Sequence, residues 1–93
     1  MNIPEIQKQL FRLKDLLSLP STDVIWSSYD SPTEVINELD MLENGILNND
    51  RVSVEKLLFL LAPTGDLQEI SISSGWGREF LVIAEALETA LKT

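Results

Sequence analysis

The chain has no cysteine and no histidine among its 93 residues. Without cysteine it forms no disulfide and offers no thiolate nucleophile or ligand, and without histidine it lacks the side chain that most often acts as acid, base or metal ligand. Cys–His and Ser–His nucleophilic pairs and the common zinc sites are therefore excluded. We predict that the protein is not an enzyme and that it has no catalytic residue, cofactor or metal site.

Basic residues are also scarce. Seven Lys and Arg stand against 15 Asp and Glu, so the formal net charge is −8 at pH 7. Nucleic acids are bound mainly by neutralising phosphates, and anionic membranes attract basic segments, so we expect neither as a partner. The natural electrostatic partner is a basic protein, which long-range attraction would steer to an acidic surface. Solubility alone is the plainer interpretation of such a net charge.

Long apolar runs are missing as well. The longest, Leu57–Ala62, covers six residues, whereas a membrane-spanning helix needs about 20. The first residues, Met1–Glu5, carry neither the basic start nor the apolar run of a signal peptide. We therefore expect a cytoplasmic protein, and the chain length predicts a single domain over residues 1–93.

Three amphipathic helices are predicted, over residues 3–18, 32–47 and 77–91. The start of the second is the clearest, because Ser31 is placed to cap it and Glu34 to complete a capping box. The positions expected to be buried are Ile6, Leu10, Leu13 and Leu17 in the first helix, Val35, Leu39, Leu42 and Ile46 in the second, and Phe80, Ile83, Ala84, Leu87 and Leu91 in the last.

The segment before the last helix is ambiguous. Residues 54–62 fit a helix and fit a buried strand equally well. Pro63 and Gly65 favour a tight turn, and residues 67–73 alternate apolar and polar side chains as a half-buried strand does. These two signals favour a β-hairpin over residues 54–73, turning at Pro63–Gly65.

The predicted fold class is therefore α+β. Three helices pack on a small antiparallel β-hairpin in the order α-α-β-β-α. Residues 24–26, Val-Ile-Trp, have the composition of a short extra strand or an extended piece laid on the core.

Acidic residues dominate the stretch 15–50, which holds eight Asp and Glu and no Lys or Arg. Glu34 and Glu38 lie one helical turn apart, a repulsive spacing that helix stability alone would not select. Together with Glu43 they flank the expected buried positions and should be solvated. The candidate protein-binding residues of this helix are Glu34, Glu38, Asp40 and Glu43. The alternative interpretation is an ordinary solvated helix face, in which Glu34 and Glu38 suit the positive helix N-terminus.

A second candidate is the junction 73–79, Ser-Ser-Gly-Trp-Gly-Arg-Glu. It lacks the spacing of a phosphate-binding loop, and its glycines suit a sharp chain reversal. Trp76 either fills the edge of the core or, with Arg78, forms a protein-binding site, because Trp and Arg are enriched at interface hot spots. The other aromatic pair, Trp26 and Tyr29, is interpreted as a lid over the core.

Two hypotheses of function follow from these features. The first is a non-enzymatic acidic interaction domain that binds a basic protein, as an inhibitor, immunity-type protein, antitoxin or secretion chaperone. The alternative is a small structural or regulatory module that works as a homodimer through the hairpin edge or an apolar helix face. Val82 motivates the homodimer, because it lies opposite the Phe80–Leu87 stripe and should be exposed.

Overall fold

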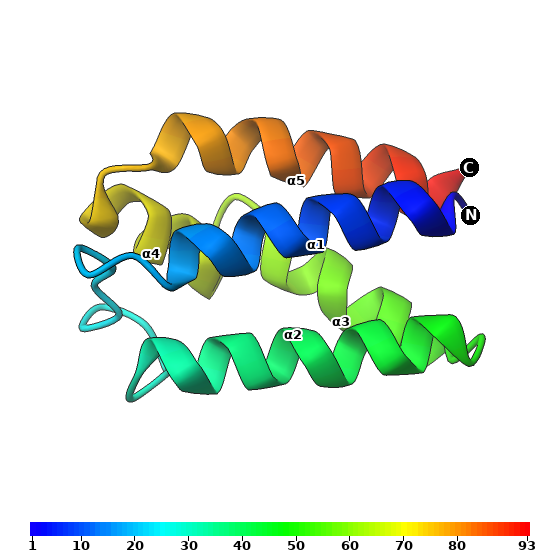
Figure 1. The fold of residues 1–93 in the computed structure, drawn as a ribbon, viewed down its shortest axis with the longest axis horizontal. Helices are drawn as coiled ribbons and strands as arrows, with labels where there is room; N and C mark the ends of the chain where they lie inside the picture. The colour runs from blue at the N-terminus through cyan, green and yellow to red at the C-terminus, as the bar shows by residue number, and fades with distance from the viewer.

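The computed structural model describes all 93 residues and contains five helices and no strand (Figure 1). α1 (Ile3–Leu17) packs between α5 (Gly77–Lys92) and α2 (Pro32–Leu47), and both neighbours run antiparallel to it. The shorter α3 (Arg51–Leu61) packs on α2, and α4 (Asp66–Ser74) joins α3 to α5. The helices thus form a closed bundle in which α2 and α5 lie on opposite sides and do not touch.

The three predicted amphipathic helices are confirmed. Each begins and ends within a residue of its expected bounds, and every apolar position expected to be buried lies in the core. The ends of the chain meet at one end of the bundle, where the backbone N–H of Asn2 donates to the carbonyl oxygen of Ala90 at 2.9 Å. No helix has the length and apolar content needed to cross a membrane.

The predicted β-hairpin is wrong, because both of its arms are helical. α3 starts at an N-cap that was not predicted: the Asp50 carboxylate accepts the backbone N–H of Val52 at 3.1 Å. Its buried apolar residues are Leu57, Leu60 and Leu61, which have helical spacing. Phe59 is 76% exposed, whereas a strand would have placed it on the same face as Leu57.

The second predicted strand, residues 67–73, is wrong for a different reason. The alternation in residues 67–73 is a coincidence of composition, since α4 buries Leu67 and Ile70 and leaves Ile72 exposed. The predicted turn does exist, with the Gly65 N–H donating to the Ala62 carbonyl oxygen at 2.9 Å, but it joins two helices. The α+β fold class is therefore corrected to an all-helical bundle.

The contact between α2 and α3 requires a glycine. A Cβ added to Gly45 would lie 1.9 Å from Ser53 Oγ and 2.7 Å from Ser53 Cβ. Ser53 is itself buried, and its hydroxyl donates to Asp50 Oδ2 at 2.9 Å. The two helices can approach this closely only because position 45 has no side chain.

Ser31→Ala should lower the free energy of unfolding by about 1 kcal/mol, which corresponds to a fall of roughly 4–8 °C in Tm for a domain of this size. The reason is that the predicted cap forms: Ser31 Oγ accepts the backbone N–H of Glu34 at 3.3 Å. Thermal unfolding followed by circular dichroism measures the shift. Ser21→Ala is the control, because Ser21 is exposed and outside any helix, and equal Tm values for the two variants would contradict the cap.

Candidate functional site

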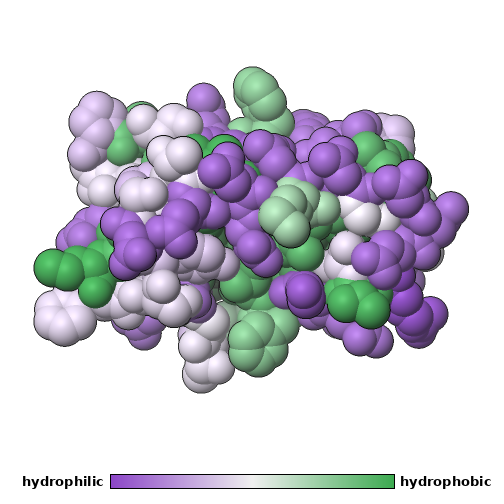
Figure 2. Space-filling view, turned by 90° about the horizontal axis from the view of Figure 1, so that it is seen from below, coloured by the Kyte–Doolittle hydropathy of each residue, from purple (hydrophilic) through white to green (hydrophobic).

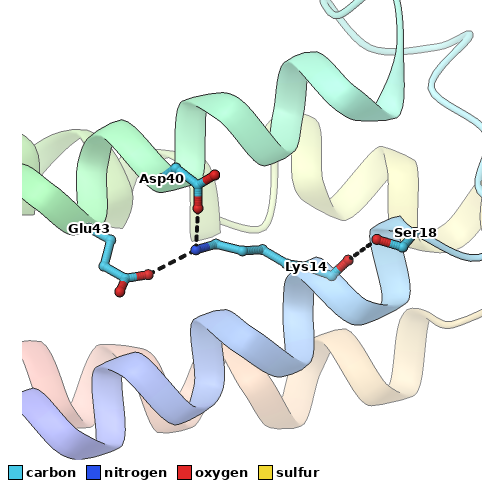
Figure 3. Close-up of polar contacts among 4 residues, drawn as sticks. All are labelled: Lys14, Ser18, Asp40 and Glu43. Atoms are coloured by element: carbon cyan, nitrogen blue, oxygen red, sulfur yellow. Dashed lines mark hydrogen bonds and ion pairs between the residues drawn. The ribbon is translucent and has the colours of Figure 1, made fainter.

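Two of the four predicted carboxylates of α2 have a structural role. Lys14 Nζ, on α1, lies 2.5 Å from Asp40 Oδ1 and 2.8 Å from Glu43 Oε1 (Figure 3). The Lys14 and Glu43 side chains are mostly buried, whereas that of Asp40 is about half exposed. Glu43 is therefore not solvated as expected, and this ion-pair network joins α1 to α2.

The network keeps Lys14 charged. Burial lowers the pKa of the ammonium group, but hydrogen bonds to Asp40 and Glu43, together with their negative charges, outweigh this effect and raise the pKa above its ordinary value. A raised pKa in the folded state means that the stabilisation is complete at neutral pH and is lost only as the pH rises through the folded value. The single positive charge of Lys14 thus offsets one of the two negative charges of Asp40 and Glu43.

The other two carboxylates of α2 have no basic partner. Glu34 Oε2 accepts the backbone N–H of Asp30 at 3.0 Å and not that of Ser31, so the predicted capping box is incomplete. Glu38 is half-buried, forms no hydrogen bond or ion pair, and lines a shallow groove of about 330 Å³ between α2 and α3 with Phe59 and Leu60. Neither carboxylate forms an ion pair, although Lys56 lines the same groove as Glu38.

The surroundings of the Tyr29 phenol include carboxylates from both α2 and α4. Its burial raises the pKa of the phenol, and the charges of Glu38, Asp66 and Glu34 raise it further. Asp66 belongs to the first turn of α4, so α2 and α4 both direct negative charge towards the segment that carries Tyr29. That segment is the connector 18–31 between α1 and α2.

The connector is longer than the roughly 2–8 residues that usually join helices of a bundle, yet it is firmly attached. The Asp66 carboxylate accepts Ser28 Oγ at 2.5 Å and the Ser28 backbone N–H at 3.3 Å. Ser74 Oγ, at the other end of α4, accepts the backbone N–H of Asp23 at 2.8 Å. Val24 is buried in the core, and the partly buried Tyr29 packs against the core cluster. The connector is therefore fixed by α4 on both sides of its middle.

Between these attachments the chain makes a turn that exposes two large apolar residues. The Ser27 backbone N–H donates to the Val24 carbonyl oxygen at 2.9 Å, which places Ile25 and Trp26 at the two central positions. Ile25 is 71% exposed and Trp26 is 75% exposed. We call this pair the Ile25–Trp26 tip. The predicted strand at 24–26 is absent, and Trp26 is not a lid, although Tyr29 does cover the core.

The tip was missed because its β-branched and aromatic residues were interpreted as strand formers. The signal that could have found it is the connector's length and its content of turn residues, since Pro20, Asp23, Ser27 and Ser28 all favour turns. Long ordered loops on a rigid scaffold are where binding residues concentrate.

The junction residues lie elsewhere. Trp76 is only 4% exposed, and its indole Nε1 has no hydrogen-bond partner, so burial leaves little of the ring to contact another protein. Gly75, with φ of 85°, makes the predicted reversal and ends α4. Arg78 is exposed in the first turn of α5, a helix that does not touch α2. The structure therefore does not unite Trp76 and Arg78 with the carboxylates of α2.

Five carboxylates that form no ion pair lie on the connector or on the parts of α2 and α4 next to it. We call them the acidic face: Asp23, Asp30, Glu34, Glu38 and Asp66. Residues 15–50 and 57–77, which include all of them, contain no Lys or Arg. Figure 2, seen from the α2 side, shows a largely hydrophilic surface interrupted by separate hydrophobic groups. No cluster of three or more candidate ligands is arranged to hold a metal ion.

Comparison with protein-family models, with curated proteins and with solved structures finds no match for this chain.

Proposed function

We propose that the protein is a non-enzymatic interaction domain that binds a basic protein through the acidic face. The observation that carries this proposal is the grouping of five carboxylates that form no ion pair, from the connector, α2 and α4, in segments that contain no base. Such a surface steers a positively charged partner towards itself and speeds the encounter. An inhibitor, immunity-type protein, antitoxin or secretion chaperone would each use it in this way.

Solubility alone explains the arrangement less well. A soluble surface needs net charge but has no need to segregate the two signs. Here Lys8, Arg12 and Lys14 lie on α1, Arg51 and Lys56 on α3, and Arg78 and Lys92 on α5, whereas α2, α4 and the connector have none. The proposal includes a cytoplasmic location, which suits a chain without cysteine.

The homodimeric alternative retains one supporting observation. Val82 is exposed as predicted, and Leu81 beside it is exposed too. Two chains of net charge −8 repel one another, however. This electrostatic cost favours a basic partner over a second copy.

Reversing two charges of the acidic face should abolish most binding to basic partners. Asp30→Lys combined with Glu38→Lys is the cleanest choice, because neither side chain forms a hydrogen bond or ion pair, whereas Glu34 bonds the Asp30 backbone and Glu43 pairs with Lys14. The immobilised native chain should retain basic proteins from a cell extract, and the double variant should lose them. For a purified partner, the association rate should fall about tenfold or more, and the rate for the native chain should fall as salt is added.

Glu85→Lys combined with Glu88→Lys is the matched control. It changes the net charge by the same amount on α5, on the opposite side of the bundle. Binding should survive in this variant with most of its native rate. If both double variants lose binding equally, net charge alone governs association and the acidic face is not a site.

A further inference from the structure

We infer that the Ile25–Trp26 tip is the apolar anchor of this interface and enters an apolar pocket that Lys or Arg side chains surround on the basic partner. The inference rests on the proposed function and adds what the acidic face by itself lacks, a source of tight and specific contact. Charges on the rim of an interface mainly set its association rate, whereas buried aromatic anchors set how slowly it dissociates.

The composition of the turn is the first argument. Central turn positions favour Gly, Pro, Asn, Asp and Ser, each of which relieves backbone strain or bonds locally. This turn has isoleucine and tryptophan there instead, and both side chains extend into solvent. The fold gains little from either residue, because neither is buried. Burial against another molecule is what would give them a stabilising role, and an aromatic side chain buries about 150–250 Å².

The rigidity of the turn is the second argument. Val24, directly before the tip, is held in the core, and Ser28, just after it, is bonded twice to Asp66. Ser27 closes the turn on the Val24 carbonyl oxygen with its hydroxyl as well, at 2.7 Å. A loop fixed in this way loses little conformational freedom when it binds, so more of the contact energy appears as affinity.

Charge complementarity identifies the occupant. Asp23 precedes the tip and its carboxylate accepts the Ile25 backbone N–H at 3.0 Å, and Asp66 lies beside Ser28 on the other side. Carboxylates therefore flank the apolar pair, in segments of the chain that contain no Lys or Arg. In Figure 2 a hydrophobic group protrudes at the end of the molecule where Figure 1 places the connector. The matching surface is an apolar cleft with cationic rims.

The other exposed aromatic residues lack this setting. Phe11 is exposed on α1 one turn from Lys8 and next to Arg12, and Phe59 is exposed on α3 one turn from Lys56. Their neighbours are mixed in sign, so a basic partner would not be directed to them. Of the exposed aromatic side chains, only Trp26 has no Lys or Arg within ten residues along the chain, and Asp23 and Asp66 flank its turn.

The test uses two synthetic probes: an amphipathic helical peptide of leucine and lysine, and an oligolysine with the same number of lysines. Dissociation constants are measured by the fluorescence anisotropy of labelled probe. The native chain should bind the amphipathic peptide more tightly than oligolysine. Trp26→Ala should raise the Kd for the amphipathic peptide about tenfold or more and leave that for oligolysine unchanged. Phe11→Ala, the matched exposed aromatic, should change neither.

A second readout locates the anchor. In a Trp76→Phe variant Trp26 is the only tryptophan, and its emission should shift to shorter wavelength with the amphipathic peptide and not with oligolysine. Equal effects of Trp26→Ala and Phe11→Ala, or no emission shift, would overturn the inference. So would a Trp26-dependent dimer in sedimentation equilibrium, or the same emission shift with phosphatidylcholine vesicles, since these identify the occupant as a second copy or a lipid.

The charge variants separate this inference from the proposal on which it rests. If Asp30→Lys with Glu38→Lys weakens binding of both probes while Trp26→Ala does not, the acidic face stands and the anchor is refuted. If those charge reversals weaken binding no more than Glu85→Lys with Glu88→Lys, the proposed function itself fails.

Discussion

Leu57→Ala should lower the free energy of unfolding by about 2–5 kcal/mol, because it opens a cavity in the core. Leu57 is 0% exposed and lies on the inner face of α3, within the cluster of 21 buried apolar residues. For a domain of this size such a loss lowers Tm by roughly 10 °C or more. Chemical denaturation, with an unchanged dependence on denaturant concentration, measures it directly.

Phe59→Ala is the matched control and should change stability by no more than about 0.5 kcal/mol, because its side chain is mostly in solvent. Leu57→Ala and Phe59→Ala together discriminate between a helix and a strand at residues 54–62. In a strand, residues 57 and 59 would point to the same face and both truncations would be costly. Similar losses for the two variants would contradict the helix α3.

Gly45→Ala should destabilise the protein by about 1–3 kcal/mol, although alanine is the better helix former. Helix propensity alone predicts a gain of about 1 kcal/mol from this change. The added Cβ would overlap Ser53, however, at 1.9 Å from its Oγ, and the backbones of α2 and α3 would have to separate. The sign of the effect therefore reports whether the two helices cross at Gly45.

A double-mutant cycle with Ser53→Gly isolates this contact. Removing the Ser53 side chain frees the space that the alanine needs, so Gly45→Ala should cost less, or become stabilising, in the Ser53→Gly background. A coupling free energy of about 1 kcal/mol or more is expected for residues in direct contact. Additive effects of the two substitutions would show that the helices do not approach each other here.

The helices with long apolar stripes could be predicted from the sequence, and the short ones could not. α1, α2 and α5 each repeat their apolar residues over four turns, and α1 and α2 begin at capping residues that the sequence displays openly. α4 has only nine residues and no side-chain cap. Over so short a stretch, one face of a helix and one face of a strand give similar patterns. Packing on α3 and α5 decides the outcome, and that information is not local.

The candidate site likewise has features that could be predicted from the sequence and features that could not. The concentration of acids in residues 15–50 was visible in the composition, because it needs only counting. Which acids are paired with a base was not, since Lys14 reaches from α1 to Asp40 and Glu43 on α2. The position of Asp66 beside the connector, where it adds to the acidic face, also depends on tertiary structure. So does the exposure of Trp26, which was expected to cover the core, whereas Trp76 fills the core edge, one of its two predicted placements.

A chemical-shift titration tests whether a cationic apolar surface binds at the connector and α2. The ¹⁵N-labelled native chain is titrated with the leucine–lysine peptide, and the backbone amides that move are mapped on the structure. We expect the largest changes in residues 23–30, in the first turns of α2 and around Asp66, with α5 unaffected. Changes that are largest on α1 and α5, or spread evenly over the surface, would contradict it.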